Sequence, residues 1–195
     1  GTQRLNSLRP GELLDLVGPL GNGFDLNRGK GKINFLVVGG TGVASVFLLA
    51  ETLHGSGEEV HLVYGGRSAD FLIGLNDFKK LGVPVFVATE DGSLGHQGLV
   101  TEGFEEYLGK FPAEHSNICT CGPNAMMEAV TAIARSKGIP CQISVESKMA
   151  CGFGVCLGCT VKTLDSYRLA CTHGPVFDGD RFVWESNSAG KENVS

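Results

Sequence analysis

Four cysteines near the carboxyl end of the chain constrain its structure more than any other feature of the sequence. Residues 149–160 read MACGFGVCLGCT, and a fourth cysteine follows in LACTHGPVF. The resulting spacing, Cys-x4-Cys-x2-Cys-x11-Cys, comprises Cys151, Cys156, Cys159 and Cys171. A plant-type [2Fe–2S] centre uses a Cys-x4-Cys-x2-Cys run and one distant cysteine. Three glycines within the same run let the backbone wrap closely and aim N–H groups at a cluster. The spacing therefore predicts that these four residues bind a [2Fe–2S] cluster.

Other uses of the four thiols fit the spacing less well. A structural zinc site usually takes two close pairs of ligands, and Cys171 has no close thiol partner in the sequence. A redox pair at Cys156 and Cys159 would leave the other two cysteines without a role. Zinc remains the alternative to iron and sulfide. The three remaining cysteines fall in apolar runs and are expected to be buried small hydrophobic residues: Cys119, Cys121 and Cys141.

Charge and hydropathy exclude several classes of protein. The 195 residues include 21 Asp and Glu against 16 Lys and Arg, with no basic run of the kind that nucleic-acid binding requires. No apolar stretch is as long as a membrane span, and no signal peptide is recognisable at the first residues. These features predict no nucleic-acid or membrane partner and a cytoplasmic protein, in which clustered thiols indicate metal rather than disulfides.

The middle of the chain predicts an α/β domain. Five short apolar runs, at residues 33–38, 60–64, 84–89, 116–121 and 141–146, alternate with amphipathic segments at 43–54, 69–81, 101–110 and 123–137. This alternation is typical of a doubly wound sheet of five parallel strands. A further strand is expected at residues 12–17, before the domain.

Two glycine turns in this domain predict a nucleotide site. The first strand runs into VVGGTGVAS, and the fourth runs into CTCGPNAMM. In a sheet of this kind the first and fourth strands flank the switch point where ligands bind, so both turns are expected beside one crevice. The second strand ends in GGRS, where Arg67 is equally consistent with a ribose or phosphate contact and with an ordinary loop residue.

Together these motifs resemble the electron-transfer subunit of the class 1B dihydroorotate dehydrogenases, a ferredoxin-reductase-like family. The resemblance is carried by GPLGNGF, GGTGVA, CGPNAMM, ATEDGSLGHQGLVT, ESKMACGFGVCLGCTVKT and RLACTHGPVFDGDRFVW. It implies an N-terminal remnant of a flavin-binding β-barrel at residues 1–31, an NAD domain at 32–146, a cluster domain at 147–186 and a tail at 187–195. The family's full barrel is absent, so the chain is expected to be a fragment of a longer subunit.

The resemblance also implies a function and a set of binding residues. A partner dihydroorotate dehydrogenase carrying FMN would supply electrons, which pass through the cluster and FAD to NAD, in a heterotetramer serving pyrimidine biosynthesis. FAD would contact Gly1 and Thr2. The residues implied for NAD are Gly39, Gly40, Thr41, Gly42, Arg67, Cys121, Gly122 and Pro123. Two alternatives are a related iron–sulfur flavoprotein subunit, of the sulfide dehydrogenase or ferredoxin:NADP reductase type, and a non-catalytic nucleotide-binding module with structural zinc.

Overall fold

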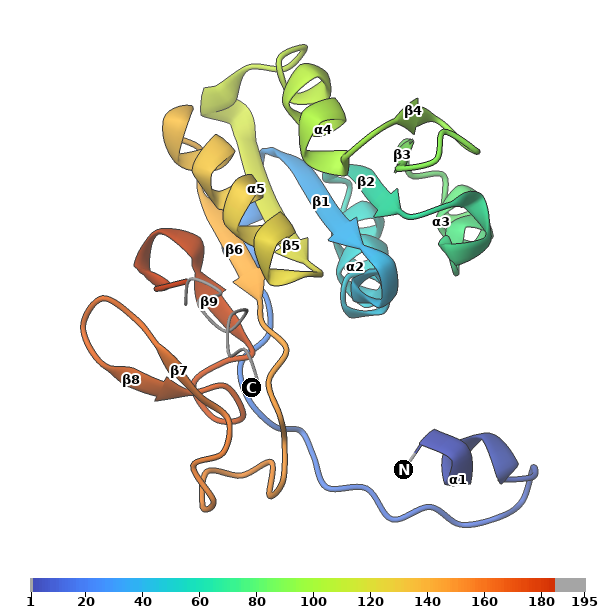
Figure 1. The fold of residues 1–195 in the computed structure, drawn as a ribbon, viewed down its shortest axis with the longest axis vertical. Coiled ribbons are helices and arrows are strands. Elements are labelled where there is room, and N and C mark those ends of the chain that lie inside the picture. The colour runs from blue at the N-terminus through green and yellow to red at the C-terminus, as the bar shows by residue number, and fades with distance from the viewer. Residues whose placement is uncertain (1, 185–195) are drawn as a thin grey trace, which may run out of the picture.

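A single mixed sheet forms the centre of the computed structural model, which describes residues 2–184 (Figure 1). The strand order is β4-β3-β2-β1-β5-β6-β9, and only the β6–β9 pair is antiparallel. Because the chain builds outward from β1 and then returns to its other side with β5, the switch point lies between these two strands. The strands are β1 Ile33–Gly39, β2 Glu59–Gly66, β3 Val85–Thr89, β4 His96–Gln97, β5 Ser116–Cys121, β6 Cys141–Ser144 and β9 Val176–Asp178.

Helices cover both faces of the sheet. Successive side chains of a strand point to opposite faces, so Leu36 and Val38 join one apolar cluster and Phe35 and Val37 the other. The first cluster includes residues of α2 and α3, and the second includes residues of α4 and α5. These helices are α2 Phe47–Gly55, α3 Leu75–Leu81, α4 Val100–Leu108 and α5 Asn124–Ser136, and a 3-10 helix, Gly40–Ser45, precedes α2.

The structure confirms the five predicted strands and four predicted helices to within a few residues at most ends. Four further strands within residues 2–184 lie outside the five predicted runs, and all are short: β4, with two residues, and β7 Thr160–Lys162, β8 Tyr167–Leu169 and β9, with three each. The prediction of a strand at residues 12–17 is wrong. That segment is irregular in the structure, although its apolar pattern resembles a strand.

The C-terminal part of the chain is connected to the sheet through β9. After β6 comes an irregular segment, and then a hairpin of β7 Thr160–Lys162 and β8 Tyr167–Leu169. The chain then pairs β9 with β6, at the register Ile143 to Phe177. The cysteines are therefore held beside the edge of the α/β domain.

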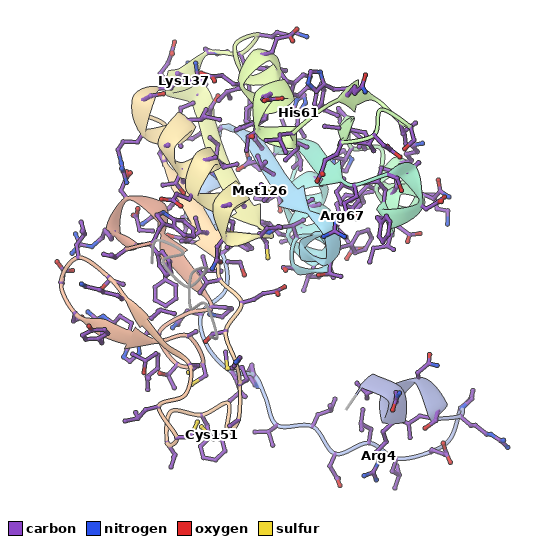
Figure 2. The ribbon with its side chains drawn as sticks, in the orientation of Figure 1. Arg4, His61, Arg67, Met126, Lys137 and Cys151 are labelled. Carbon is purple, nitrogen blue, oxygen red and sulfur yellow. The ribbon has the colours of Figure 1, made fainter. Side chains whose placement is uncertain are left out.

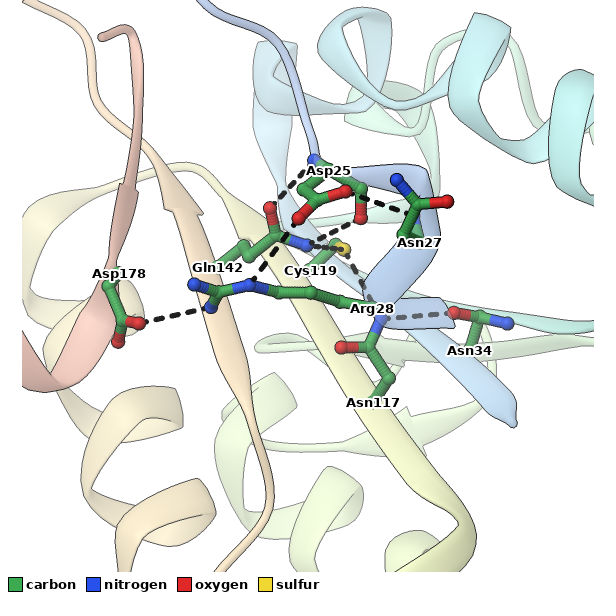
Figure 3. Close-up of polar contacts among 8 residues, drawn as sticks. All are labelled: Asp25, Asn27, Arg28, Asn34, Asn117, Cys119, Gln142 and Asp178. Carbon is green, nitrogen blue, oxygen red and sulfur yellow. Dashed lines mark hydrogen bonds and ion pairs between the residues drawn. The ribbon is translucent and has the colours of Figure 1, made fainter. Parts of the chain in front are cut away.

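The segment before β1 is also fixed to this edge of the sheet. Figure 3 shows the contacts, in which the Asp25 backbone N–H donates to Gln142 Oε1 at 2.8 Å and Arg28 Nη1 lies 3.0 Å from Asp178 Oδ2. Buried Asn34 donates from Nδ2 to the Gly29 carbonyl at 3.0 Å. Helix α1 Thr2–Ser7, by contrast, lies away from the sheet (Figure 1). Among residues 2–184, every helix falls short of the length and apolar character needed to cross a membrane.

Candidate cluster loop and nucleotide cavity

Residues 149–159, here called the cysteine loop, connect β6 to β7 without regular secondary structure before Cys159. Its backbone turns sharply at Gly152 and Gly154, whose φ values are 80° and 91°. Residues other than glycine rarely adopt such φ values, which explains the density of glycine in this run. The consequence is a tight loop in which the N–H groups of Cys156 and Gly158 donate to Cys151 Sγ and Cys156 Sγ.

The four cysteines of the predicted cluster site lie as two contacting pairs of residues. Cys159 Sγ is 3.2 Å from Cys171 Sγ, and both residues are buried. The backbone N–H of Cys156 donates to Cys151 Sγ at 3.4 Å, with Cys156 exposed and Cys151 half-buried. Within residues 2–184, no group of three or more His, Cys, Asp or Glu residues is arranged to hold a single metal ion. The structure thus places Cys159 beside Cys171 and Cys151 beside Cys156.

Backbone N–H groups favour the thiolate form of two of these cysteines. Hydrogen bonds from the N–H groups of Cys156 and Phe153 lower the pKa of Cys151 to about 6. The pKa of Cys159 is lowered by hydrogen bonds from Cys171, and the pKa of Cys171 is raised in return. Thiolates are the form that binds metal, and [2Fe–2S] clusters take four of them. The donor set therefore fits an iron–sulfur cluster, which Cys151, Cys156, Cys159 and Cys171 would hold.

A second site is a cavity of about 480 Å³ at the carboxyl ends of β1, β2 and β3. Four of the predicted NAD residues line it: Gly39, Gly40, Arg67 and Pro123. Figure 2 shows Arg67 and Met126 at this side of the α/β domain, with Cys151 well apart from both. The sequence did not identify several other lining residues, which include Phe71, Glu90, Leu99, Thr101 and Met126.

The two predicted glycine turns pack directly against each other. A Cβ atom at Gly42 would overlap the carbonyl oxygen of Cys121, and one at Gly39 would lie 2.8 Å from Met126 Sδ. Glycine is needed at Gly42 because the backbones of the two turns approach so closely there. This contact explains how the ends of β1 and β5 form one wall of the switch point.

The remaining predicted nucleotide residues lie beside this wall. Thr41 is exposed, Gly42 is buried and Gly122 is half-buried. Cys121 is buried with its Sγ 3.1 Å from Ser45 Oγ, and burial raises its pKa. Of the two residues predicted to contact FAD, Gly1 lies outside the described residues and Thr2 is the first residue of α1.

The other cysteines behave as predicted from their apolar surroundings. Cys119 and Cys141 are each 2% exposed, and burial raises the pKa of Cys141 to about 12. Burial also raises the pKa of Cys119 far above its ordinary value. Neither thiol is suited to metal binding, because its raised pKa keeps it protonated.

Comparison with known proteins matches each site to a family. Residues 146–183 match the iron–sulfur cluster binding domain of dihydroorotate dehydrogenase B, and residues 36–132 match the oxidoreductase NAD-binding domain. The expected fold class, an NAD-binding α/β domain followed by an iron–sulfur domain, is confirmed.

Individual relatives agree with these matches. The dihydroorotate dehydrogenase B (NAD(+)) electron transfer subunit of Clostridium acetobutylicum is 38% identical over 94% of this chain and 70% of the relative. The subunit of the same name from Caldanaerobacter subterraneus subsp. tengcongensis is 38% identical over 91% of this chain and 69% of the relative. A solved structure of an NADH-dependent reduced ferredoxin-NADP oxidoreductase superposes with a TM-score of 0.78 and 33% identity, covering 94% of this chain and 65% of that one. The chain therefore belongs to the family of dihydroorotate dehydrogenase B electron transfer subunits.

Proposed function

We propose that this chain is an electron-transfer subunit that receives electrons from a partner dihydroorotate dehydrogenase and delivers them to NAD. The observation that carries the proposal is the presence, in one chain, of four cysteines arranged as two contacting pairs and of a cavity at the switch point. A [2Fe–2S] cluster exchanges single electrons and a flavin converts these to the two that NAD accepts as hydride.

We assign residues to each cofactor by their position in the structure. We assign Cys151, Cys156, Cys159 and Cys171 to the cluster. Backbone N–H groups of the cysteine loop stabilise the thiolate charge there, as they lower the pKa of Cys151. The turn of Gly39, Gly40, Thr41 and Gly42 would hold the dinucleotide phosphates, with Arg67 on one side and Cys121, Gly122 and Pro123 on the other.

The domain limits belong to the same proposal. Residues 32–146 would form the nucleotide domain and 147–186 the cluster domain, in agreement with the start of the iron–sulfur match at residue 146. Residues 1–31 would complete a flavin site together with a barrel, with FAD in contact with Gly1 and Thr2. The expected tail, 187–195, lies outside the described residues.

The relatives are named as subunits, so a partner catalytic subunit is part of the proposal. We propose an FMN-containing dihydroorotate dehydrogenase, assembled with this subunit as a heterotetramer. The cysteine loop is suited to contact it, because Phe153, Val155 and Leu157 are 56%, 72% and 61% exposed around exposed Cys156. Exposed apolar groups gathered in one loop are typical of a protein interface.

A charge placed in the loop tests this contact. Val155→Glu is expected to weaken association with the partner subunit by at least about tenfold, because desolvating a carboxylate against an apolar surface is costly. Leu164→Glu is a matched control, since Leu164 is 67% exposed in the turn beyond β7. Calorimetry or co-purification measures association, and equal behaviour of the two variants would place the partner elsewhere.

A second function is favoured by the similarity to the solved NADH-dependent reduced ferredoxin-NADP oxidoreductase. In this alternative the same cluster and cavity serve a different electron donor. The two proposals can be distinguished by their electron donors. The protein and its co-purifying partner are mixed with dihydroorotate in one experiment and with reduced ferredoxin in another. Cluster reduction by dihydroorotate, seen as loss of visible absorbance, supports the first proposal, and reduction by ferredoxin alone supports the second.

A further inference from the structure

The nucleotide cavity is lined by a charged side chain, that of Glu90, to which the proposed function gives no role. Of the described residues that line it, only Arg67 and Glu90 are charged. Arg67 follows β2 and Glu90 follows β3. In the strand order, these two strands lie on the other side of β1 from β5. The inference below rests on the proposed nucleotide site. With phosphates at the β1 turn and the nicotinamide toward Cys121 and Pro123, the adenosine of a bound dinucleotide would lie over the ends of β2 and β3.

Hydrogen bonds between the two loops fix both charges in the same wall. The backbone N–H of Glu90 donates to the Gly66 carbonyl at 3.1 Å, and that of Asp91 donates to the Arg67 carbonyl at 3.2 Å. Ser93 Oγ accepts from the Ala69 N–H at 2.8 Å and donates to Asp91 Oδ1 at 2.6 Å. The loop after β3 is therefore held against the loop after β2.

Arg67 and Glu90 do not neutralise each other. Among the ion pairs within residues 2–184, none includes either side chain. Both side chains are exposed and so are available to a ligand in the cavity. A ligand that enters this half of the cavity meets one cation and one anion.

These two charges have opposite preferences for the two nicotinamide dinucleotides. NAD has a hydroxyl at the 2′ position of its adenosine ribose, and NADP has a phosphate there. A carboxylate accepts a hydrogen bond from the hydroxyl and repels the phosphate, whereas an arginine attracts the phosphate. In many dinucleotide domains the acidic residue lies at the end of the second strand, a position that this chain fills with Gly66 and Arg67.

We propose that Glu90, supplied by the neighbouring strand β3, takes over this role and selects NAD against NADP. Arg67 then serves the adenosine and its 5′-phosphate rather than a 2′-phosphate. Removing the carboxylate exposes the attraction of Arg67 for a 2′-phosphate. Glu90 is thus a specificity-determining residue at the adenosine end of the cavity.

Fragments of the dinucleotides test the proposal at that end alone. Calorimetric titration of the 195-residue protein with AMP and with adenosine 2′,5′-bisphosphate gives the ratio of their dissociation constants. Wild type is expected to prefer AMP, and Glu90→Gln is expected to shift the ratio toward the bisphosphate by about tenfold, since both charges are solvent-exposed and screened. Glu90→Asp should retain the wild-type preference. Arg67→Gln combined with Glu90→Gln should lose the gained affinity for the bisphosphate.

Asp70→Asn is the matched control, because Asp70 is a nearby exposed carboxylate that does not line the cavity. An equal shift in this variant, or no shift in Glu90→Gln, would overturn the proposal. Titration with NADH distinguishes this failure from failure of the proposed function. If NADH binds and the ratio does not respond to Glu90, only the selectivity proposal is wrong, and if NADH does not bind, the nucleotide site itself is wrong.

Discussion

The cysteine thiols of this chain differ in chemical environment, because some are buried and others accept hydrogen bonds from backbone N–H groups. Cys151 has its pKa lowered to about 6 by backbone N–H groups, whereas burial raises the pKa of Cys141 to about 12. The sequence separates the two groups through spacing, because only four of the seven cysteines follow a cluster pattern. It does not reveal the N–H groups, whose direction depends on the backbone of the cysteine loop.

Replacing a ligand should therefore differ from replacing a buried cysteine. Cys156→Ser is expected to lose most of the cluster, since a hydroxyl is a harder and much less acidic ligand than a thiolate. Cys141→Ser should keep the cluster and lose about 1–3 kcal/mol of stability, because a hydroxyl is buried in an apolar site. Iron analysis and visible absorbance measure the first effect, and thermal unfolding measures the second. Equal cluster loss in the two variants would show that the ligand set is wrong.

Alkylation with iodoacetamide at pH 9 compares the thiols directly. An ordinary thiol is substantially ionised at this pH, but burial raises the pKa of Cys119 and Cys141 and keeps both protonated. Because the thiolate is the nucleophile, both residues should remain unmodified in the folded protein and react after unfolding in urea. Peptide mass spectrometry identifies the modified sites. Rapid labelling of Cys141 in the folded protein would contradict the burial described above.

At the scale of elements, strand prediction succeeded where apolar runs were long and failed where they were short. The five main strands combine buried apolar residues with neighbours on both sides, so local pattern and tertiary context agree. β9 has three residues and pairs with β6 across more than thirty positions of sequence, a contact that local pattern cannot show. The segment at 12–17 has a strand-like pattern, but a strand also requires a partner with which to pair.

The sequence indicates some residues of the cavity and not others, for similar reasons. The glycine turns at Gly39 and Gly122 were recognisable because close backbone approach demands glycine. Glu90 and Met126 were missed, since a carboxylate in a loop and a methionine in a helix have no distinctive local signal. Only the register of β2 with β3 places Glu90 beside Arg67, through the pairing of Gly66 with Thr89.

The contact between the β1 and β5 turns supports a prediction at this scale. Gly42→Ala is expected to separate the two turns, because its Cβ would overlap the Cys121 carbonyl. We expect NADH binding to weaken by at least about tenfold and stability to fall by about 1–3 kcal/mol. Gly55→Ala at the end of α2 is the control, since a Cβ there meets no atom within 4 Å. Titration with NADH measures the affinity, and thermal unfolding measures the stability. Unchanged NADH affinity in Gly42→Ala would show that the contact between the turns does not shape the nucleotide site.

At the scale of the whole molecule, the chain joins two electron-carrying sites through one sheet. The chain leaves the nucleotide domain at the end of β6 and continues into the cysteine loop. It later forms β9, which pairs with β6. The residues before β1 bind the same edge through Gln142 and Asp178 (Figure 3). This shared edge fixes the cluster domain to the nucleotide domain, as electron transfer between their cofactors requires.

Iron and acid-labile sulfide in the anaerobically purified protein test the central claim most directly. The account predicts about two irons and about two sulfides per chain, held by the four cysteines of the paired arrangement. It also predicts a red-brown protein whose colour is bleached by a reductant such as dithionite. One zinc per chain, with no labile sulfide and no colour, would contradict the claim and leave a nucleotide-binding module with a structural metal.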